Sequence, residues 1–370
     1  MKFTFDKGAM IKEISIAQEI ISVKNAETIL SNIYISAENN TLSIKATDKA
    51  VHYETSLPVQ VQEEGFTTIF CDKFINILNS LPEGEIEFIK KTDDTLSNII
   101  IQPIGKKIKF QMKCIDKEFP SIPTADAVPY FEVPSLDFKQ MISQTSFAVS
   151  TEEARYFMCG VFLEKRDDNF NLVATDGKRL SFSSRNILAG VNDFPSAIVP
   201  VKILNIISKH APDEGNISIA IVDKMIFFKF SSYKFASSLL EGQFPNYTRV
   251  IPTKQEHSFK VKKSDLSSAL KRVALMADKK VARIYFDIQP GVLKITSPET
   301  DLGSADEEIP CQYADENFLI ALNCRYIEEP LRTIDTDLVT FEFTEEMKAV
   351  TIKSEPTKDF FHIVMPMQKE

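Results

Sequence analysis

The sequence lacks a long apolar run, and no uncharged stretch reaches the roughly 18 residues of a membrane-spanning helix. Its first ten residues, MKFTFDKGAM, contain neither the apolar segment nor the small-residue cleavage site of a signal peptide. We therefore expect a cytoplasmic protein that has no membrane partner.

Cysteine and histidine are few and scattered. The five cysteines never form a CxxC pair, so they predict neither a disulfide framework nor a zinc site. The four histidines, at positions 52, 210, 257 and 362, lie far apart in the chain. We therefore expect no metal and no cofactor.

The short motifs of enzymes are missing as well. The sequence contains no P-loop, GxGxxG, GxSxG or HExxH motif. Asp176 and Lys178 are close enough to suggest an acid–base pair, but they fall on a predicted turn. We therefore expect a protein without catalytic residues.

What the sequence has instead is a repeat of 128 residues. Phe3-Thr4-Phe5 is echoed by Phe131-Glu132-Val133 and by Phe259-Lys260-Val261, and apolar residues at helical spacing follow each copy. Ser264 is the expected N-cap of the third of these helices. The repeat predicts three similar domains, at residues 1–127, 128–254 and 255–370.

A second shared segment lies in the middle of each repeat. Residues 71–88, 199–219 and 322–343 each read as a short helix, a turn and an alternating strand. Much of the remainder alternates in the same way, as in residues 108–114. The predicted fold class is α+β, with two helices and antiparallel sheets in every domain.

The first two repeats also share a strand end. Thr47-Asp48 and Thr175-Asp176 lie 128 residues apart, and each pair follows a strand-like run. Ordinary turn chemistry explains the first copy. The second copy continues as Gly177-Lys178-Arg179-Leu180, which indicates an additional role.

Four motifs in order resemble the bacterial sliding clamps, the β subunit of DNA polymerase III. They are EARYFMCGV (153–161), ATDGKRL (174–180), FPNYTRV (244–250) and VMPM (364–367). The resemblance covers the whole chain. It implies that two copies of three domains each close head to tail into a six-domain ring around duplex DNA. Such a ring tethers the replicative polymerase and has no enzymatic activity of its own.

The resemblance also implies a pocket between the second and third domains. It would bind short motifs that carry glutamine and leucine or phenylalanine, as found in the polymerase, the clamp loader and repair proteins. The apolar chain end fits this expectation, because exposed methionines adapt well to peptide side chains. The implied pocket residues are Arg155, Met158, Thr175, Gly177, Lys178, Arg179, Leu180, Pro245, Arg249, Val250, Asn323, Tyr326, Met347, Ile363, Val364, Met365, Pro366 and Met367.

Charge is distributed unevenly along the chain. Residues 260–283 hold eight basic and two acidic residues in a chain whose net charge is −9. Basic helices within an acidic protein fit a hole for DNA, with phosphate contacts that are independent of base sequence. The charge pattern indicates Lys202, Lys271 and Arg272 as DNA contacts, and the resemblance implies Lys24, Lys73, Tyr156 and Phe157.

A ring needs an interface between copies whose rotation closes. Lys106, Lys107 and Lys109 surround Ile108, Phe110 and Met112, whereas Asp306, Glu307 and Glu308 form an acidic stretch. Opposite charges on two edge strands favour pairing between unlike surfaces. By resemblance, Leu275 and Met276 pack into the same seam.

One alternative remains open at this point. A three-repeat scaffold that binds proteins without encircling DNA shares the predicted fold and the pocket. The basic residues of 260–283 favour the ring.

Overall fold

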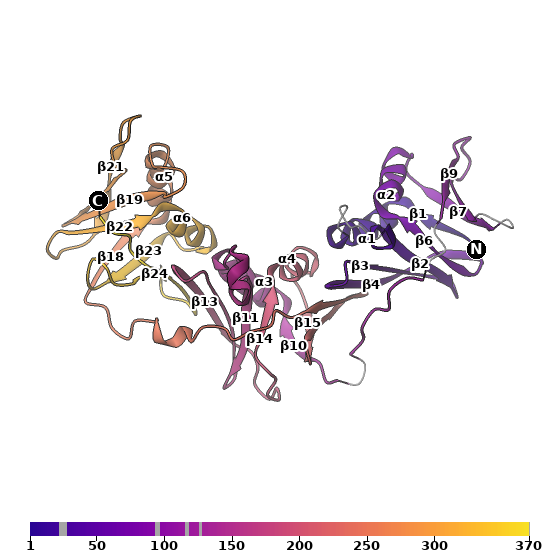
Figure 1. The fold of residues 1–370 in the computed structure, drawn as a ribbon, viewed down its shortest axis with the longest axis horizontal. Helices are drawn as coiled ribbons and strands as arrows, with labels where there is room; N and C mark the ends of the chain where they lie inside the picture. The colour runs from indigo at the N-terminus through magenta and orange to yellow at the C-terminus, as the bar shows by residue number, and fades with distance from the viewer. Residues whose placement is uncertain (22–27, 93–96, 115–117, 126–127, 370) are drawn as a thin grey trace. The chain divides into compact units, whose positions relative to one another are not determined.

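A computed structural model describes residues 1–21, 28–92, 97–114, 118–125 and 128–369 (Figure 1). Lys24, an expected DNA contact, lies outside these described residues. The chain forms two compact units. Unit 1 comprises Met1–Ser135 and Asn205–Leu239, and unit 2 comprises Leu136–Leu204 and Leu240–Glu370. In the part of the chain that is described, no helix is long and apolar enough to cross a membrane.

Each repeat contributes two α-helices to the described structure, at the positions that the sequence predicts. They are α1 (Lys7–Ile20), α2 (Cys71–Ser80), α3 (Ser135–Thr145), α4 (Val201–His210), α5 (Lys263–Val273) and α6 (Cys324–Thr333). The apolar residues at helical spacing are buried, as Met10, Ile14 and Ala17 show in α1. The periodic pattern was therefore a correct guide to the face that packs on each core.

The start of α5 differs from the prediction. Ser264 is not the N-cap, because the helix begins at Lys263 and the N-cap is Lys262. The Lys263 N–H is instead satisfied by the Asp337 carbonyl at 2.9 Å. The Ser264 hydroxyl donates to Asp265 at 2.9 Å. A tertiary contact has replaced the local cap that the sequence suggested.

Unit 1 contains two antiparallel sheets among its described residues, with strand orders β5-β1-β7-β8-β9 and β10-β15-β16-β17-β4-β3-β2-β6. The strands are β1 (Lys2–Asp6), β2 (Asn32–Glu38), β3 (Thr41–Thr47), β4 (Val51–Pro58), β5 (Gln60–Glu63), β6 (Gly65–Phe70), β7 (Glu85–Thr92), β8 (Ser97–Pro103), β9 (Phe110–Lys113), β10 (Phe131–Pro134), β15 (Asn216–Val222), β16 (Met225–Phe230) and β17 (Tyr233–Ser238).

Strands of the first and second repeats join within unit 1. β17 pairs with β4, from Lys234 opposite Glu54 to Ser237 opposite Val51. The buried Glu13 carboxylate of α1 supports this junction, because it accepts hydrogen bonds from the hydroxyls of Tyr53 at 2.8 Å and Tyr233 at 3.1 Å. A buried carboxylate with two donors is a stable arrangement.

Unit 2 is organised by one antiparallel sheet with the order β14-β11-β12-β13-β25-β24-β23-β18-β21-β20-β19-β22. Helices α5 and α6 pack beside its third-repeat part (Figure 1). The strands are β11 (Gly160–Arg166), β12 (Asn169–Thr175), β13 (Arg179–Asn186), β14 (Ala197–Pro200), β18 (His257–Lys262), β19 (Arg283–Gln289), β20 (Val292–Thr296), β21 (Asp306–Gln312), β22 (Phe318–Asn323), β23 (Leu338–Phe343), β24 (Val350–Glu355) and β25 (Phe360–Val364).

The second and third repeats meet at the pairing of β13 with β25. Arg179 lies opposite Val364, and Ser183 lies opposite Phe360. The last strand of the chain thus completes a sheet that the second repeat begins. The segment that carries ATDGKRL is thereby placed directly beside the segment that carries VMPM.

Candidate functional site

The turn between β12 and β13 holds the second ATD copy in a fixed geometry. The Thr175 Oγ1 accepts from the Gly177 N–H at 3.1 Å and donates to the Arg179 carbonyl at 2.6 Å. The Asp176 Oδ1 accepts from the N–H groups of Lys178 at 2.9 Å and Arg179 at 3.0 Å. Gly177 has φ +86°, a conformation that glycine adopts without steric cost. The predicted turn is confirmed.

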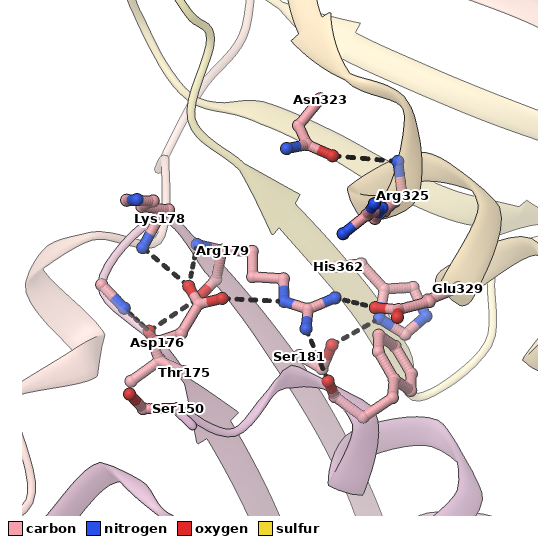
Figure 2. Close-up of polar contacts among 12 residues, drawn as sticks. Ser150, Thr175, Asp176, Lys178, Arg179, Ser181, Asn323, Arg325, Glu329 and His362 are labelled. Carbon is pink, nitrogen blue, oxygen red and sulfur yellow. Dashed lines mark hydrogen bonds and ion pairs between the residues drawn. The ribbon is translucent and has the colours of Figure 1, made fainter. Parts of the chain in front are cut away.

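Arg179 is the centre of the polar network at this turn (Figure 2). Its Nε donates to Asp176 Oδ2 at 3.1 Å, its Nη2 donates to the Phe147 carbonyl at 2.6 Å, and its Nη1 pairs with Glu329 of α6. The guanidinium carbon lies 4.6 Å from the centre of the Tyr326 ring. Only 10% of the side chain is exposed. Arg179 therefore connects the turn to the third repeat more than it lines an open wall.

His362 of β25 lies buried beneath this network. Its Nδ1 is 2.9 Å from the Ser181 Oγ, and its Nε2 has no hydrogen-bond partner among the described residues. Burial, helped by the positive charge of Arg179, lowers the pKa of His362 to about 3. The imidazole is therefore neutral at physiological pH.

The end of the chain is fixed against both neighbouring segments. The Met365 N–H donates to the Lys178 carbonyl at 2.9 Å, and the Met367 N–H donates to the Ala321 carbonyl of β22 at 2.8 Å. β25 ends at Val364, as the sequence predicts, and Pro366 beyond it is buried. The last apolar residues are thus part of the folded unit.

The structure brings the four motifs of the resemblance into direct contact. Arg155 donates to the Asp176 carbonyl at 3.2 Å. Leu180 and Ile363 share an apolar cluster with Phe244 and Tyr247. Together with the Met365 contact, these interactions join segments that are up to two hundred residues apart in the sequence.

The expected pocket residues fall into two groups. Buried or mostly buried members form the base, and they are Met158, Thr175, Leu180, Ile363, Val364 and Pro366. Exposed apolar members lie above it, with exposed fractions of 42% for Met365, 50% for Met347 and 53% for Val250. Gly177, Lys178 and Arg249 are exposed, whereas Pro245, Tyr326 and Met367 are half-buried. This combination of a fixed base and accessible apolar side chains suits peptide binding.

Asn323 has a structural task at the start of α6. Its Oδ1 accepts from the Arg325 N–H at 2.9 Å and caps the helix, while its Nδ2 donates to the Val281 carbonyl at 3.1 Å. Burial raises the pKa of the Tyr326 phenol, and the nearby Asp176 carboxylate raises it further. Both polar groups are therefore neutral donors or acceptors at the margin of the site.

The basic half of the expected seam lies on unit 1. β9 is the edge strand of its sheet and pairs with β8, from Asn98 opposite Lys113 to Ile101 opposite Phe110. The strand is shorter than the predicted alternation, because Ile108 precedes it. Lys106, Lys107 and Lys109 are exposed, Ile108 is 39% exposed, and Phe110 and Met112 are half-buried.

The acidic half differs from the expectation of an edge strand. β21 lies between β20 and β18. β18 pairs with it only at Cys311 and Gln312, because most of β18 pairs with β23 on its other side. In the described structure, residues 306–310 therefore have a strand neighbour on the β20 side alone. The prediction was wrong about the strand's position in the sheet, but half of β21 still has an open edge.

Arg272 forms an ion pair inside this acidic surface. Its Nε donates to Glu307 Oε2 at 2.7 Å and its Nη2 to Glu307 Oε1 at 2.5 Å. The hydrogen bond from Arg272 lowers the pKa of Glu307. The pair connects the end of α5 to β21, so a residue expected at the DNA and a residue expected at the seam contact each other.

The other expected DNA contacts are located as follows. Lys73 on α2, Lys202 on α4 and Lys271 on α5 are exposed. Tyr156 is 51% exposed, and its ring meets the half-buried Phe157 edge-on at 5.8 Å. These positions are divided between the two units, so each is described only within its own unit.

Comparison with known proteins identifies the family. The N-terminal, central and C-terminal domain models of the DNA polymerase III beta subunit match residues 1–123, 132–246 and 248–368. The chain belongs to this family. It is 43% identical to the beta sliding clamp of Treponema pallidum (strain Nichols), with both chains covered in full.

Solved structures agree with this assignment. The beta sliding clamp of C. crescentus superimposes with a TM-score of 0.94 at 25% identity, over 100% of this chain and 99% of the other. A DnaN sliding clamp from Bartonella birtlesii gives 0.92 at 28% identity, with full coverage of both chains. The predicted class of three tandem α+β domains is confirmed. The protein is a DNA sliding clamp, and the alternative of a scaffold that does not encircle DNA is not supported.

Sequence reasoning missed several residues of this site. Phe147, Glu329 and His362 surround Arg179, yet none was expected there. Their only sequence signal was weak, since His362 alternates with the apolar residues of the last strand. No such pattern marked Glu329, which is 150 residues from Arg179.

Proposed function

We propose that two copies of this clamp close head to tail around duplex DNA and tether the replicative polymerase through the site at the β12–β13 turn. The single observation that carries the peptide site is the hydrogen bond from the Met365 N–H to the Lys178 carbonyl. It fixes an exposed methionine beside the turn that Arg179 holds. The proposed domain boundaries are 1–127, 128–254 and 255–370.

The ligand of this site would be a short peptide that carries glutamine and a leucine or phenylalanine. Met365, Met347 and Val250 offer exposed apolar surface, and the carbonyls and charged groups of the turn offer polar contacts. The clamp loader, the polymerase and repair proteins would compete for the same surface. The protein would act in the cytoplasm, without catalysis and without a cofactor.

The ring would close between unlike surfaces of two copies. Lys106, Lys107 and Lys109 supply positive charge near the open edge of β9, and Asp306 and Glu308 supply exposed negative charge near the half-open edge of β21. Opposite charges favour this pairing over the pairing of two identical surfaces. Leu275, which is 81% exposed, adds apolar area to the acidic side.

The peptide site is tested by fluorescence anisotropy with a labelled peptide that carries glutamine, leucine and phenylalanine. Met365→Ser and Met347→Ser should each weaken binding by roughly tenfold, because each loses about half of a buried apolar side chain. Leu136→Ser is the matched control, since Leu136 is 49% exposed on α3 outside the site. Equal affinities for all variants and the native protein would place the peptide elsewhere.

The DNA-facing role of α5 is tested by charge reversal. Lys271→Glu should reduce retention on closed circular DNA, and the loss should be greatest at low salt, where phosphate contacts are strongest. Lys271 is the informative residue, because Arg272 already pairs with Glu307. Lys234→Glu, at an exposed position on β17, controls for net charge. Equal losses for both variants would show that only net charge matters.

A further inference from the structure

One leucine is far more exposed than folding alone would leave it. Leu302 is 89% exposed, the largest value among the large apolar residues of the described structure. It lies in the turn between β20 and β21. Neither the sequence pattern nor the family resemblance assigned it a role. Single exposed apolar residues are common, so its surroundings decide whether it matters.

The turn that carries Leu302 is held by several hydrogen bonds. The Thr300 N–H donates to the Gly303 carbonyl at 3.1 Å, and the Gly303 N–H donates to the Thr300 carbonyl at 2.8 Å. The Thr300 hydroxyl donates to the Gly303 carbonyl at 2.9 Å and accepts from the Leu302 N–H at 3.3 Å. The leucine is therefore presented to solvent on an ordered backbone, so little backbone entropy is left to lose on binding.

This turn lies beside the end of α5. A Cβ on Gly303 would be 3.5 Å from the Met276 Cε. The Arg272–Glu307 ion pair connects α5 to β21 just beyond the turn. Leu302 is therefore close to Leu275 and Met276, the apolar residues already expected in the seam. We call these three residues the seam patch.

The charges around the seam patch indicate what covers it. Asp301, Asp306 and Glu308 are exposed on the same connection and strand, so the patch has an acidic surround. A complementary surface exists on unit 1 of every copy. The connection between β8 and β9 carries Ile104 at 55% and Ile108 at 39% exposure, next to exposed lysines. An apolar centre with a charged margin is the usual composition of a specific interface.

We propose that Leu302 is an apolar anchor of the ring, docking against Ile104 and Ile108 of a second copy. This inference rests on the proposed head-to-tail dimer and adds a residue that decides its strength. The lysine–carboxylate contacts select the correct surfaces, and Leu302 supplies contact energy that does not depend on salt. Burial of a leucine corresponds to roughly a ten- to hundredfold change in a dissociation constant.

The test measures the dimer dissociation constant of the full chain by sedimentation equilibrium. Leu302→Ser should weaken the dimer by roughly tenfold or more, to the same extent at low and high salt. Lys107→Glu should also weaken it, but its effect should shrink as salt rises. Leu136→Ser is the control that changes a similarly accessible leucine on α3. Because Leu302 is exposed, the variant should keep the native melting temperature.

A double-mutant cycle identifies the docking partner. If Leu302 contacts Ile104, Leu302→Ser combined with Ile104→Ser weakens the dimer less than the sum of the single effects. Strict additivity would overturn the proposed contact. An unchanged dimer in Leu302→Ser, together with a weaker dimer in Leu275→Ser, would overturn the role of Leu302 and leave the ring intact. Failure of the native chain to dimerise would instead contradict the proposed function itself.

Discussion

The two ATD turns have the same internal chemistry and different roles. In the first, Thr47 Oγ1 accepts from the Lys49 N–H at 2.9 Å, and Asp48 Oδ1 accepts from the N–H groups of Ala50 and Val51 at 3.0 and 2.7 Å. The same acceptors, 128 residues later, take the N–H groups of Gly177, Lys178 and Arg179. A threonine and an aspartate are thus sufficient to build this turn.

The difference lies in the residue that follows each turn. Val51 is buried in the sheet of unit 1, whereas Arg179 at the corresponding position reaches the carbonyl of Phe147 and the carboxylate of Glu329. The carbonyl of Lys178 also accepts from the chain end. The comparison shows that a repeated turn gains a function through one changed side chain and its distant contacts.

The largest expected effect comes from Arg179→Ala, compared with Val51→Ala. Loss of the guanidinium leaves the largely buried Asp176 and Glu329 carboxylates unpaired and should destabilise the region by about 2–4 kcal/mol. Peptide binding should fall by more than roughly tenfold. Val51→Ala should cost about 1–3 kcal/mol through a cavity and leave peptide binding unchanged.

Hydrogen exchange locates the effect of each variant. The amides of Arg179 and Met365 should exchange faster in Arg179→Ala only, because these amides belong to the turn and to the chain end that rests on it. Arg179→Lys keeps the charge but cannot form the same planar fork, so it should give an intermediate loss. Equal peptide binding in Arg179→Ala and the native protein would contradict the proposed connection.

The next effect is a difference in acid sensitivity between the units. His362 has a folded pKa of about 3 against 6.5 in the unfolded chain, so the folded state binds fewer protons between these values. Stability is therefore complete above pH 6.5 and falls by about 1.4 kcal/mol per pH unit below it, roughly 2 kcal/mol by pH 5. Burial also lowers the pKa of His52, but the Asp48 carboxylate opposes that shift.

Unit 2 should therefore lose hydrogen-exchange protection more steeply than unit 1 between pH 6.5 and 5. His362→Gln should flatten the pH dependence of unit 2, and His52→Gln is the corresponding control in unit 1. Parallel losses in both units, unaffected by His362→Gln, would show that another group titrates.

A smaller effect should follow from exchanging the residues at the positive φ of each turn. Gly177→Ala places a Cβ 3.1 Å from the Arg155 Nη1 at φ +86° and should cost about 1–2 kcal/mol. Lys49 adopts φ +78°, so Lys49→Gly should be neutral or stabilise by up to about 1 kcal/mol. Urea unfolding measures both changes, and a loss of stability in Lys49→Gly would contradict this account.

The smallest effect concerns the last residues of the chain. The Lys369 Nζ lies 2.6 Å from Glu346 Oε1, next to the exposed Met347. Deletion of residues 368–370 should strengthen peptide binding by up to about threefold, because an exposed ion pair at the margin of the site is weak. Lys369→Ala separates the ion pair from chain length. An unchanged affinity after deletion would show that the tail does not screen the site.

The sequence predicts this fold well where the determinants are local. The repeat, the six helices of the described structure and the ATD turn depend on apolar periodicity and on side chains one to four residues from their partners. Ser264 shows where a local rule fails, because the Asp337 carbonyl satisfies the helix start instead. Local patterns therefore located the elements better than they located their ends.

The network around Arg179 could not be predicted in the same way. Glu329 is 150 residues away, and the burial of His362 depends on the pairing of strands from two repeats. The half-open edge of β21 and the exposure of Leu302 likewise follow from how β18 diverges and how one turn projects. These features depend on tertiary contacts that no periodic pattern encodes.

The central claim is that the protein stays on DNA because it encircles it. The most direct measurement loads the protein onto nicked circular DNA with a clamp loader and ATP, removes free protein, and cuts the circle once. The account predicts that bound protein is lost when the circle is cut and is retained when both ends of the linear DNA are blocked. Retention on linear DNA with open ends would contradict it, because the protein would then be held by affinity and not by topology.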